Sequence, residues 1–334
     1  MDKRNHLIDL LRFVAATWVA IFHFNEPIPY IANWYRSFLK IGYVGVAIFF
    51  VISGYCVYLS ALRSKTPRDF LVRRICRIFP PYWFSILLVG LSVIVSLIVN
   101  KANSVAVLPK NISGILATIT LSTTPLFDVP IMNWVYWTLT YEVVFYFLVF
   151  ISMFAKHQYR IYSYLFISIS GFFLPVHEMW PLFFVKYWPA FALGVATYRL
   201  LNEKTQLWQT ALLLAISVSG LFYIQIRPYE AITCIITAVL IVSNNFKPLK
   251  ANPISTLGDY SYSIYLTHVP LGIFILGVVK QQSIVQNNVW VNIVWDLTLY
   301  AVIVCLAKLM FKFIELPAIS FGKKITNVTR NAAV

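Results

Sequence analysis

The stretch from Leu7 to Phe24 limits what this chain can fold into, because it is apolar enough to cross a membrane and still carries ionisable side chains. Arg12 and His23 lie eleven positions apart, close to three helical turns, so both project from one face at a spacing of about 16 Å, with Asp9 near the same face. Such groups are costly at membrane depth unless they face a bundle interior or an aqueous cavity. The stretch therefore predicts a transmembrane helix with a functional polar stripe. The alternative is that Arg12 and Asp9 only extend to the inner headgroups and His23 to the outer ones.

The composition excludes an ordinary soluble domain. Apolar residues make up 60% of the chain and charged residues 12%, which is about half the charged share of a typical soluble protein. The formal net charge of +15 does not indicate a nucleic-acid partner, because the Lys and Arg residues cluster beside apolar segments rather than along one soluble face. The four cysteines are far apart and form no Cys-x-x-Cys pair, so we expect neither a disulfide framework nor a metal site.

The apolar runs predict an all-α, polytopic membrane helix bundle in one domain, with a core over residues 7–317 and a cytoplasmic tail over 318–334. About ten transmembrane helices are expected, at 7–24, 42–62, 82–99, 133–154, 160–174, 182–201, 207–225, 229–244, 258–279 and 290–314. The run at 112–122 is too short to cross and is expected to be re-entrant or interfacial. Lys and Arg are more frequent in the loops on the N-terminal side, so both termini are expected in the cytoplasm.

The second span is rich in small residues. Gly42, Gly45 and Gly54 allow helix backbones to approach closely, so we expect tight packing near the first span. Ser53 and Tyr55 on the same span are candidates for lining a cavity.

A basic segment, FLVRRICRIFPPYW, follows the second span. It places Arg73, Arg74 and Arg77 just inside the membrane, and Pro80 and Pro81 are expected to interrupt the chain before the third span begins. Guanidinium groups at this level suit the phosphates of an anionic cofactor. The alternative is a topological anchor that contacts lipid headgroups.

The fourth span carries a carboxylate inside an apolar helix. Trp134 and Trp137 are expected at the outer interface, where aromatic residues gather, so Glu142 should lie in the outer half of the bilayer. That depth matches the depth of His23, and a buried carboxylate needs a partner. The two side chains are therefore predicted to form a His–Glu pair.

The last two spans add polar side chains that have two interpretations each. Ser261 and His268 lie on the ninth span, and the histidine is either a packing residue or part of a site. Glu315 precedes the end of the last span and is either functional or part of a structural salt bridge, whereas Asp296 is expected to face water.

Assembled in order, these segments resemble the acyltransferase 3 family of integral-membrane O-acyltransferases over nearly the whole chain. IDLLRFVAATWVAIFHF is similar to the family's opening helix, in which ten residues separate Arg from His, and GVAIFFVISGY is similar to its second helix. FLVRRICRIFPPYW is similar to its Arg-Arg-x-x-Arg-Ile-x-Pro loop and WTLTYEVVFY to its Trp-Ser-Leu-x-x-Glu-x-x-Phe-Tyr segment. GDYSYSIYLTHVPL and FIELP are similar to its last two motifs. Thr138 stands where the family usually has Ser, and Tyr141 replaces a common acidic residue, which argues against a scheme that needs a second carboxylate beside Glu142.

The resemblance implies an enzyme of the bacterial inner membrane that moves an acetyl group from cytoplasmic acetyl-CoA to a hydroxyl of O-antigen, capsule or exopolysaccharide. An alcohol is a poor nucleophile, so a base with a pKa of about 7 raises the rate by roughly 10² to 10⁴, and histidine is the natural choice. His23 is assigned as this base and Glu142 as the group that orients or charge-stabilises it. The residues assigned to the donor's phosphates are Arg12, Arg73, Arg74 and Arg77. Supporting roles are assigned to Asp9, Ser53, Tyr55, Trp137, Ser261, His268 and Glu315.

The partners expected from the resemblance are acetyl-CoA, a glycan or lipid-linked saccharide acceptor, the lipid bilayer and proteins of polysaccharide assembly. Two other classes stay open at this point. A multi-span carrier or exporter of a polysaccharide precursor or small metabolite also places polar residues midway through its bundle. A structural partner in a polysaccharide-assembly complex would use the same charges for packing.

Overall fold

The fold consists of helices and their connections throughout the ranges that the computed structural model describes, 4–26, 32–100, 107–174, 182–224, 227–275 and 283–331. The longer helices are α1 (His6–Asn25), α3 (Gly45–Arg63), α4 (Pro67–Asn100), α6 (Trp137–Ser152), α7 (Arg160–Ser170), α8 (Trp188–Asn202), α9 (Leu207–Tyr223), α10 (Pro228–Phe246), α14 (Val289–Met310) and α15 (Leu316–Asn331). The shorter elements are α2 (Trp34–Leu39), η1 (Gly42–Val44), α5 (Ile112–Ile119), η2 (Trp134–Tyr136), η3 (His157–Tyr159), η4 (Phe183–Lys186), α11 (Pro253–Thr256), η5 (Leu257–Tyr260), α12 (Ser261–Thr267), η6 (His268–Ile275), α13 (Ser283–Asn287) and η8 (Phe311–Glu315). The expected all-α class is confirmed.

Six helical segments of the described residues are long and apolar enough to cross a membrane, by length and composition. They are His6–Asn25, Trp34–Arg63, Pro67–Val95, Trp134–Ser152, Pro228–Phe246 and Val289–Thr326. The other four expected spans fall on shorter helices: α7, α8, α9, and α12 with η6. The structure confirms a membrane-type helix bundle but not the expected number of ten. α8 shows one reason, since it has 15 residues, fewer than the roughly 20 that a crossing helix needs.

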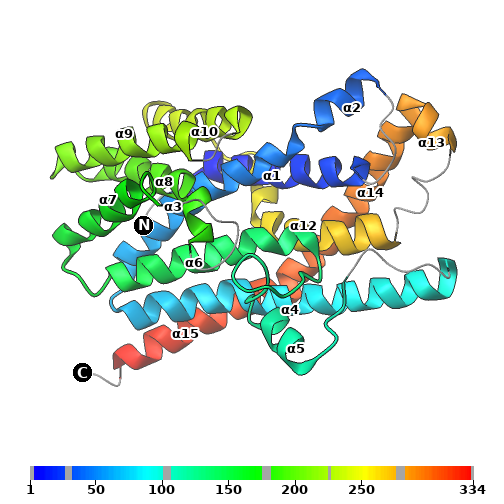
Figure 1. Cartoon of the computed structure of the whole chain (residues 1–334), viewed down its shortest axis with the longest axis horizontal. Coiled ribbons are helices and arrows are strands. Elements are labelled where there is room, and N and C mark those ends of the chain that lie inside the picture. Colours follow the sequence, from blue (N-terminus) through cyan, green and yellow to red (C-terminus); the bar gives the residue numbers. More distant parts are fainter. Residues whose placement is uncertain are drawn as a thin grey trace.

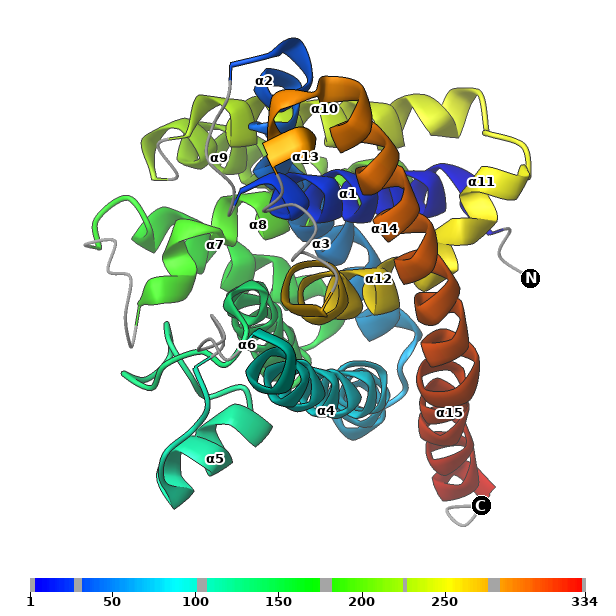
Figure 2. The same cartoon turned by 90° about the vertical axis from the view of Figure 1, so that its right-hand side faces the viewer.

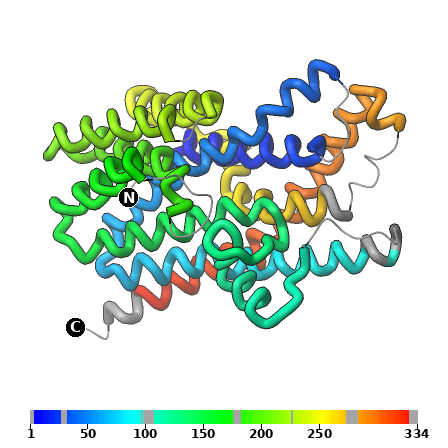
Figure 3. The backbone as a smooth tube through the Cα atoms, in the orientation of Figure 1, coloured from blue at the N-terminus to red at the C-terminus, as the bar shows by residue number. Residues whose placement is uncertain are grey.

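The helices run alongside one another, and α1 begins and α15 ends at the same end of the bundle (Figure 1). We name this end the inner end and the opposite end the outer end. Viewed from the outer end, α12 lies between α1, α4, α6 and α14 (Figure 2), and it contacts α1, α4 and α14. The run from α14 through η8 to α15 passes from the outer end to the inner end, where α15 packs beside α4 (Figure 3).

Glycines let α3 and the turn before it pack closely on two neighbours. Gly42 and Gly45 lie against α1, which confirms the expected contact between the first two spans. Gly54 faces α8 instead: a methyl group there would overlap the carbonyl of Phe191, and one on Gly194 would overlap a carbonyl of α3. α3 is therefore held between α1 and α8, with no room for side chains at these crossings.

The two prolines were expected to interrupt the chain before the third span. Instead α4, which is 34 residues long, continues through Pro80 and Pro81. Proline removes backbone donors, and such breaks are tolerated in membrane helices where neighbours satisfy the freed groups. The carbonyls that lose their helical donors are those of Cys76 and Arg77, four positions before each proline, and Tyr262 of α12 donates a hydrogen bond of 2.9 Å to the adjacent carbonyl of Ile78. The consequence for the site is that Arg74 and Arg77 belong to a continuous helix that passes through the bundle rather than to a loop.

The short run at 112–122 forms α5, which lies beside the middle of α4 (Figure 1). Tyr82 and Trp83 of α4 donate hydrogen bonds to the carbonyls of Thr118 and Ile119 at its end. Apolar side chains on its outer face, including Ile112, are exposed. An eight-residue apolar helix at mid-length of α4 fits the short non-crossing segment that the sequence predicts.

A buried carboxylate holds the outer end of α1. Asp296 of α14 does not face water as expected but is fully buried, and it accepts hydrogen bonds from Asn25 (2.8 Å) and Tyr35 (2.7 Å). Asn292 donates to the side chain of Asn25, and Arg36 donates to its carbonyl. Helices α1, α2 and α14 are thereby joined just beyond His23.

Candidate functional site

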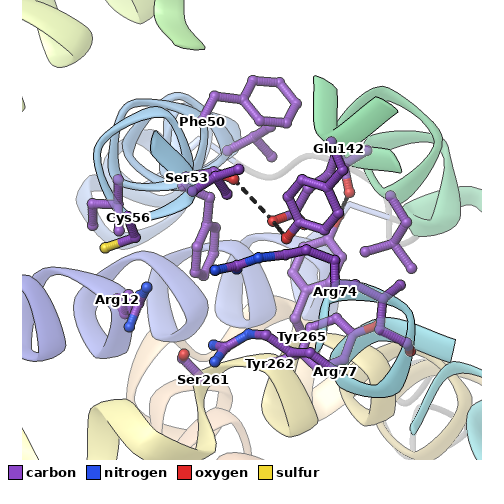
Figure 4. Close-up of a pocket in the computed structure, with 18 residues that line it drawn as sticks. Arg12, Phe50, Ser53, Cys56, Arg74, Arg77, Glu142, Ser261, Tyr262 and Tyr265 are labelled. Carbon is purple, nitrogen blue, oxygen red and sulfur yellow. Dashed lines mark hydrogen bonds between the residues drawn. The ribbon is translucent and has the colours of Figure 1, made fainter. Parts of the chain in front are cut away.

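A cavity of about 80 Å³ lies between α1, α3, α4, α6 and α12, and arginines dominate its polar lining (Figure 4). We name it the inner cavity. Arg12 comes from α1, Arg74 and Arg77 from α4, and Glu142 from α6. Figure 4 shows the three guanidinium groups directed toward the same space. The lining contains three guanidinium groups and one carboxylate, so this space suits an anionic ligand.

The contacts of Arg74 leave part of its hydrogen-bonding capacity unused. Its guanidinium lies 5.7 Å from the ring centre of Phe70 and 5.4 Å from that of Tyr146. Its Nε is buried and has no hydrogen-bond partner among the described residues. A buried donor without a partner lowers the stability of the folded protein. This N–H group is therefore suited to donate a hydrogen bond to a bound ligand.

Glu142 is the acidic member of the inner cavity. Ser53 donates a hydrogen bond of 3.0 Å to it, and Tyr146 donates a second to the same oxygen. Arg77 lies within electrostatic range of Glu142 and of Glu315, which is buried and accepts a hydrogen bond of 2.8 Å from Ser263. Glu315 therefore interacts with Arg77 but does not line the inner cavity.

Four other predicted residues take different places. Ser261 lines the inner cavity, whereas Arg73 turns away and donates to Thr326 of α15 at 3.0 Å. Asp9 pairs with Arg4 at 2.6 Å and lies 3.7 Å from Arg12, so it balances charge at the inner end of α1. Tyr55 does not line the inner cavity; its ring packs on Tyr198.

A second cavity, of about 280 Å³, lies nearer the outer end, and we name it the outer cavity. It is lined by His23 and Glu26 from the end of α1, by Trp134 and Trp137 from η2 and α6, and by Glu230 of α10, together with other aromatic residues. The two tryptophans, which the sequence predicts at the level of the outer interface, both line this cavity.

The partner of His23 in the outer cavity is Glu26. Its Oε2 lies 2.9 Å from the Nδ1 of His23, and the indole nitrogen of Trp134 lies 3.4 Å from the same atom. A carboxylate only accepts and an indole N–H only donates, so Nδ1 cannot serve both at once. The shorter contact assigns the proton to Nδ1. Nε2 then carries the lone pair, which is the form of histidine that can act as a base.

The predicted pairing of His23 with Glu142 is corrected by these contacts. Glu142 bonds to Ser53 and Tyr146 in the inner cavity, while His23 bonds to Glu26 in the outer one. A similar depth along two helices does not determine which way their side chains face, and here they face different cavities.

His268 packs against His23, with ring centres 5.4 Å apart and an angle of 28° between the rings. It is fully buried, and its Nδ1 lies 3.2 Å from the carbonyl of Ile264. Since a carbonyl only accepts, Nδ1 of His268 carries a proton. The ring therefore supports one face of His23 without lining either cavity.

Val46 and Tyr265 line both cavities. The hydroxyl of Tyr265 is fixed by a hydrogen bond of 2.9 Å to the carbonyl of Val135 and by contact with Thr138. α1 passes both cavities and contributes Arg12 to one and His23 to the other.

Several lining residues were not singled out from the sequence. Glu26 lies three positions after His23, a helical spacing that would have identified it had the first span been extended past residue 24. No comparable sequence spacing identifies Glu230 or Tyr265. Only the packing of segments far apart in the chain brings these two residues to the cavities.

The model of the acyltransferase 3 family, described as an acyltransferase domain, matches residues 5–311. The exopolysaccharide production protein ExoZ of Rhizobium meliloti (strain 1021) is 30% identical over 249 residues, which cover 68% of this chain and 76% of ExoZ. An O-acetyl transferase of Shigella phage Sf6 is 40% identical over 84 residues, 24% of either chain. Nodulation protein 10 of Rhizobium leguminosarum bv. viciae is 36% identical over 94 residues, 26% of this chain and 25% of that protein. No solved structure matches the chain.

The family match begins before α1 and ends in η8, so it includes every helix that lines the two cavities. Because it covers nearly the whole chain, this protein belongs to the acyltransferase 3 family.

Proposed function

We propose that the protein transfers an acetyl group from cytoplasmic acetyl-CoA to a hydroxyl of a surface or secreted glycan in the inner membrane of a bacterium. The observation that carries this proposal is a pair of unlike cavities that share Val46 and Tyr265 in their linings. One cavity is lined by arginines, and the other contains a histidine whose partner is a carboxylate. The proposal places the inner end of the bundle, and with it both termini, on the cytoplasmic side.

The donor enters the inner cavity. Arg74 and Arg77 bind its phosphates from α4, and Arg12 guides or binds them from α1, while Glu142 holds the arginines in place. The buried Nε of Arg74, which has no hydrogen-bond partner among the described residues, supports this role. A narrow cavity of about 80 Å³ suits the thin pantetheine arm, which then passes Val46 and Tyr265 toward His23.

The chemistry takes place in the outer cavity. Nε2 of His23 removes the proton from the acceptor hydroxyl, and the oxygen attacks the carbonyl carbon of the thioester. The carbon–sulfur bond breaks, and the departing CoA thiolate takes the proton from the imidazolium. Glu26 is a positioning residue, since its bond to Nδ1 leaves Nε2 free and stabilises the positive charge of the intermediate imidazolium.

The names of the relatives support a glycan acceptor. One is described as an exopolysaccharide production protein and another as an O-acetyl transferase. An acceptor of this kind is delivered as a lipid-linked or polymeric saccharide, which implies contact with the bilayer and with proteins of polysaccharide assembly.

The test uses membranes that contain the protein, radiolabelled acetyl-CoA and lipid-linked saccharides extracted from the same cells. Wild-type protein should label the saccharide, and His23→Ala should not, at equal abundance in the membrane. His157→Ala is the matched control, because His157 is exposed and lines neither cavity. Label in the product of His23→Ala would contradict the role of His23. Uptake of saccharide without any labelling would support a carrier instead.

A further inference from the structure

The outer cavity contains a second charged pair beside His23 and Glu26. Arg227 precedes α10 and Glu230 lies in its first turn, with Nη1 of the arginine 3.3 Å from Oε1 of the glutamate. Both residues line the cavity. The side chain of Glu230 is 7% exposed and that of Arg227 58%, so the carboxylate lies in the wall and the guanidinium near the opening.

The position of Glu230 at a helix start does not explain its burial. An acidic residue in the first turn stabilises a helix equally well when it faces water. Burial of a carboxylate is costly unless a partner compensates for the lost hydration. The pairing with Arg227 offsets this cost but leaves the carboxylate facing a cavity that a solute can enter, which is how hydroxyl-binding carboxylates are placed.

Aromatic rings form the apolar part of the same cavity. The rings of Trp137 and Tyr187 lie 5.3 Å apart with 39° between them, and the guanidinium of Arg227 lies 5.6 Å from the ring centre of Tyr43. Such rings combine a flat apolar face with polar edges. A sugar ring has the complementary form, with C–H groups on its faces and hydroxyls at its edge.

The charge of the outer cavity distinguishes it from the inner one. Its described lining residues include two carboxylates, Glu26 and Glu230, and one guanidinium, that of Arg227, which pairs with Glu230, so the carboxylates exceed the guanidinium by one charge. A hydroxyl can donate to a carboxylate, whereas an anionic group would be repelled at short range. The inner cavity, with three guanidinium groups and one carboxylate, has the opposite preference.

We propose that Arg227, Glu230, Tyr187 and Tyr43 form the acceptor subsite and that it selects a neutral sugar ring over a uronic acid. The rings receive the face of the sugar, Glu230 accepts from its hydroxyls, and a second hydroxyl is presented to Nε2 of His23. The inference rests on the proposed function, because it needs His23 to act on a hydroxyl in this cavity.

The test compares acceptors on purified wild-type protein in detergent with radiolabelled acetyl-CoA. The probes are methyl glycosides of glucose, galactose and mannose, each set against the methyl glycoside of the matching uronic acid. The neutral sugar should be acetylated with at least about tenfold higher kcat/KM, the size expected from one unfavourable charge contact. Equal or better acetylation of the uronic acids overturns this inference and leaves the proposed function standing. Acetylation of neither group, with lipid-linked saccharide still labelled in membranes, overturns this inference alone, whereas loss of both reactions counts against the proposed function as well.

A variant locates the selectivity. Glu230→Gln should raise the KM for the neutral glycoside about tenfold and narrow the difference from the uronic acid, while the KM for acetyl-CoA stays as in wild type. Asp128→Asn is the matched control, because Asp128 is an exposed carboxylate outside both cavities. An unchanged acceptor KM in Glu230→Gln removes that residue from the subsite. The wild-type comparison decides the inference even if the variant does not fold.

Discussion

The Oε2 of Glu26 lies 2.9 Å from the Nδ1 of His23, three positions earlier on the same helix. The pair ends α1 at the outer cavity, where the network around Asp296 fixes the helix end. A base needs an orienting partner on one nitrogen to keep the other free, and this arrangement supplies both within one turn.

Replacing Glu26 tests whether it determines the tautomer of His23. In Glu26→Gln the amide can donate to Nδ1, which moves the proton to Nε2 and removes the base. We expect kcat to fall about 10- to 100-fold with little change in the KM for acetyl-CoA. Glu26→Asp should restore part of the activity, because it can still accept from Nδ1. A purely structural role would instead lower the amount of folded protein for both variants alike.

The same pair predicts a pH-dependent contribution to stability. The hydrogen bond from His23 lowers the pKa of the Glu26 carboxyl below its usual 4.5. A carboxyl with a lowered pKa in the folded state stabilises the fold fully above its unfolded pKa and loses this effect as the pH falls through the folded value. Wild type should therefore melt at a higher temperature than Glu26→Gln at pH of about 6, and the difference should vanish near pH of about 3. Melting curves in detergent measure this, and a constant difference would contradict the pairing.

Of the arginines on α4, Arg74 and Arg77 are expected to bind the donor, and Arg73 is not. Arg74→Ala and Arg77→Ala should each weaken acetyl-CoA binding about 10- to 100-fold, the effect of losing a hydrogen bond to a charged group. Lysine replacements should restore only part of the affinity, because lysine lacks the two-pronged guanidinium geometry. Arg73→Ala is the matched control, since Arg73 contacts α15. Isothermal titration with acetyl-CoA distinguishes them, and equal losses for all three would indicate a general charge effect.

Acetyl transfer should be sensitive to the volume of the side chain at Val46. Val46 lines both cavities, so in Val46→Phe the larger side chain should block passage of the donor arm, and acetyl transfer should be lost while acetyl-CoA still binds. Val14→Phe adds the same volume on an exposed position of α1 and should leave transfer unchanged. Full transfer by Val46→Phe would show that the donor reaches His23 by another route.

The buried network at the outer end of α1 should contribute strongly to stability. Asp296→Ala removes the acceptor of the half-buried Tyr35 hydroxyl and of one of the two N–H groups of the buried Asn25 amide, which should lower the free energy of unfolding by about 3 kcal/mol. Asp296→Asn should cost less, because its carbonyl still accepts one bond. Thermal unfolding measures the effect of both variants. A change below about 0.5 kcal/mol for Asp296→Ala would show that the network contributes little to stability.

The periodicity of the first span predicted the arrangement of Arg12 and His23, because both lie on one regular helix and three turns separate them. The pairing of Glu142 could not be predicted in the same way. Depth follows from the position of a residue along its own helix, but the direction of its side chain depends on how that helix is rotated against its neighbours. The same limit applies to Asp296, whose burial depends on the packing of α2 and α14 around the end of α1.

The prolines of α4 illustrate a different limit. Their local preference is to end a helix, and the sequence therefore predicted a break before the third span. Tyr262, almost two hundred positions away, donates to the carbonyl of Ile78 beside Pro80 and Pro81. The folded bundle thus packs α4 as one continuous helix despite the local signal, and this places Arg74 and Arg77 inside the protein.

One rigid helix carries both Arg12 and His23, so the distance between the two cavities cannot change without bending α1. A donor whose phosphates are held by arginines at one level can present its thioester at the histidine only if the arm between them has the matching reach. α1 would in this way discriminate among thioesters by the length of their carrier: acetylated fragments that lack the nucleotide, or have a shortened arm, fall short of the acceptor even when the acetyl group is the same.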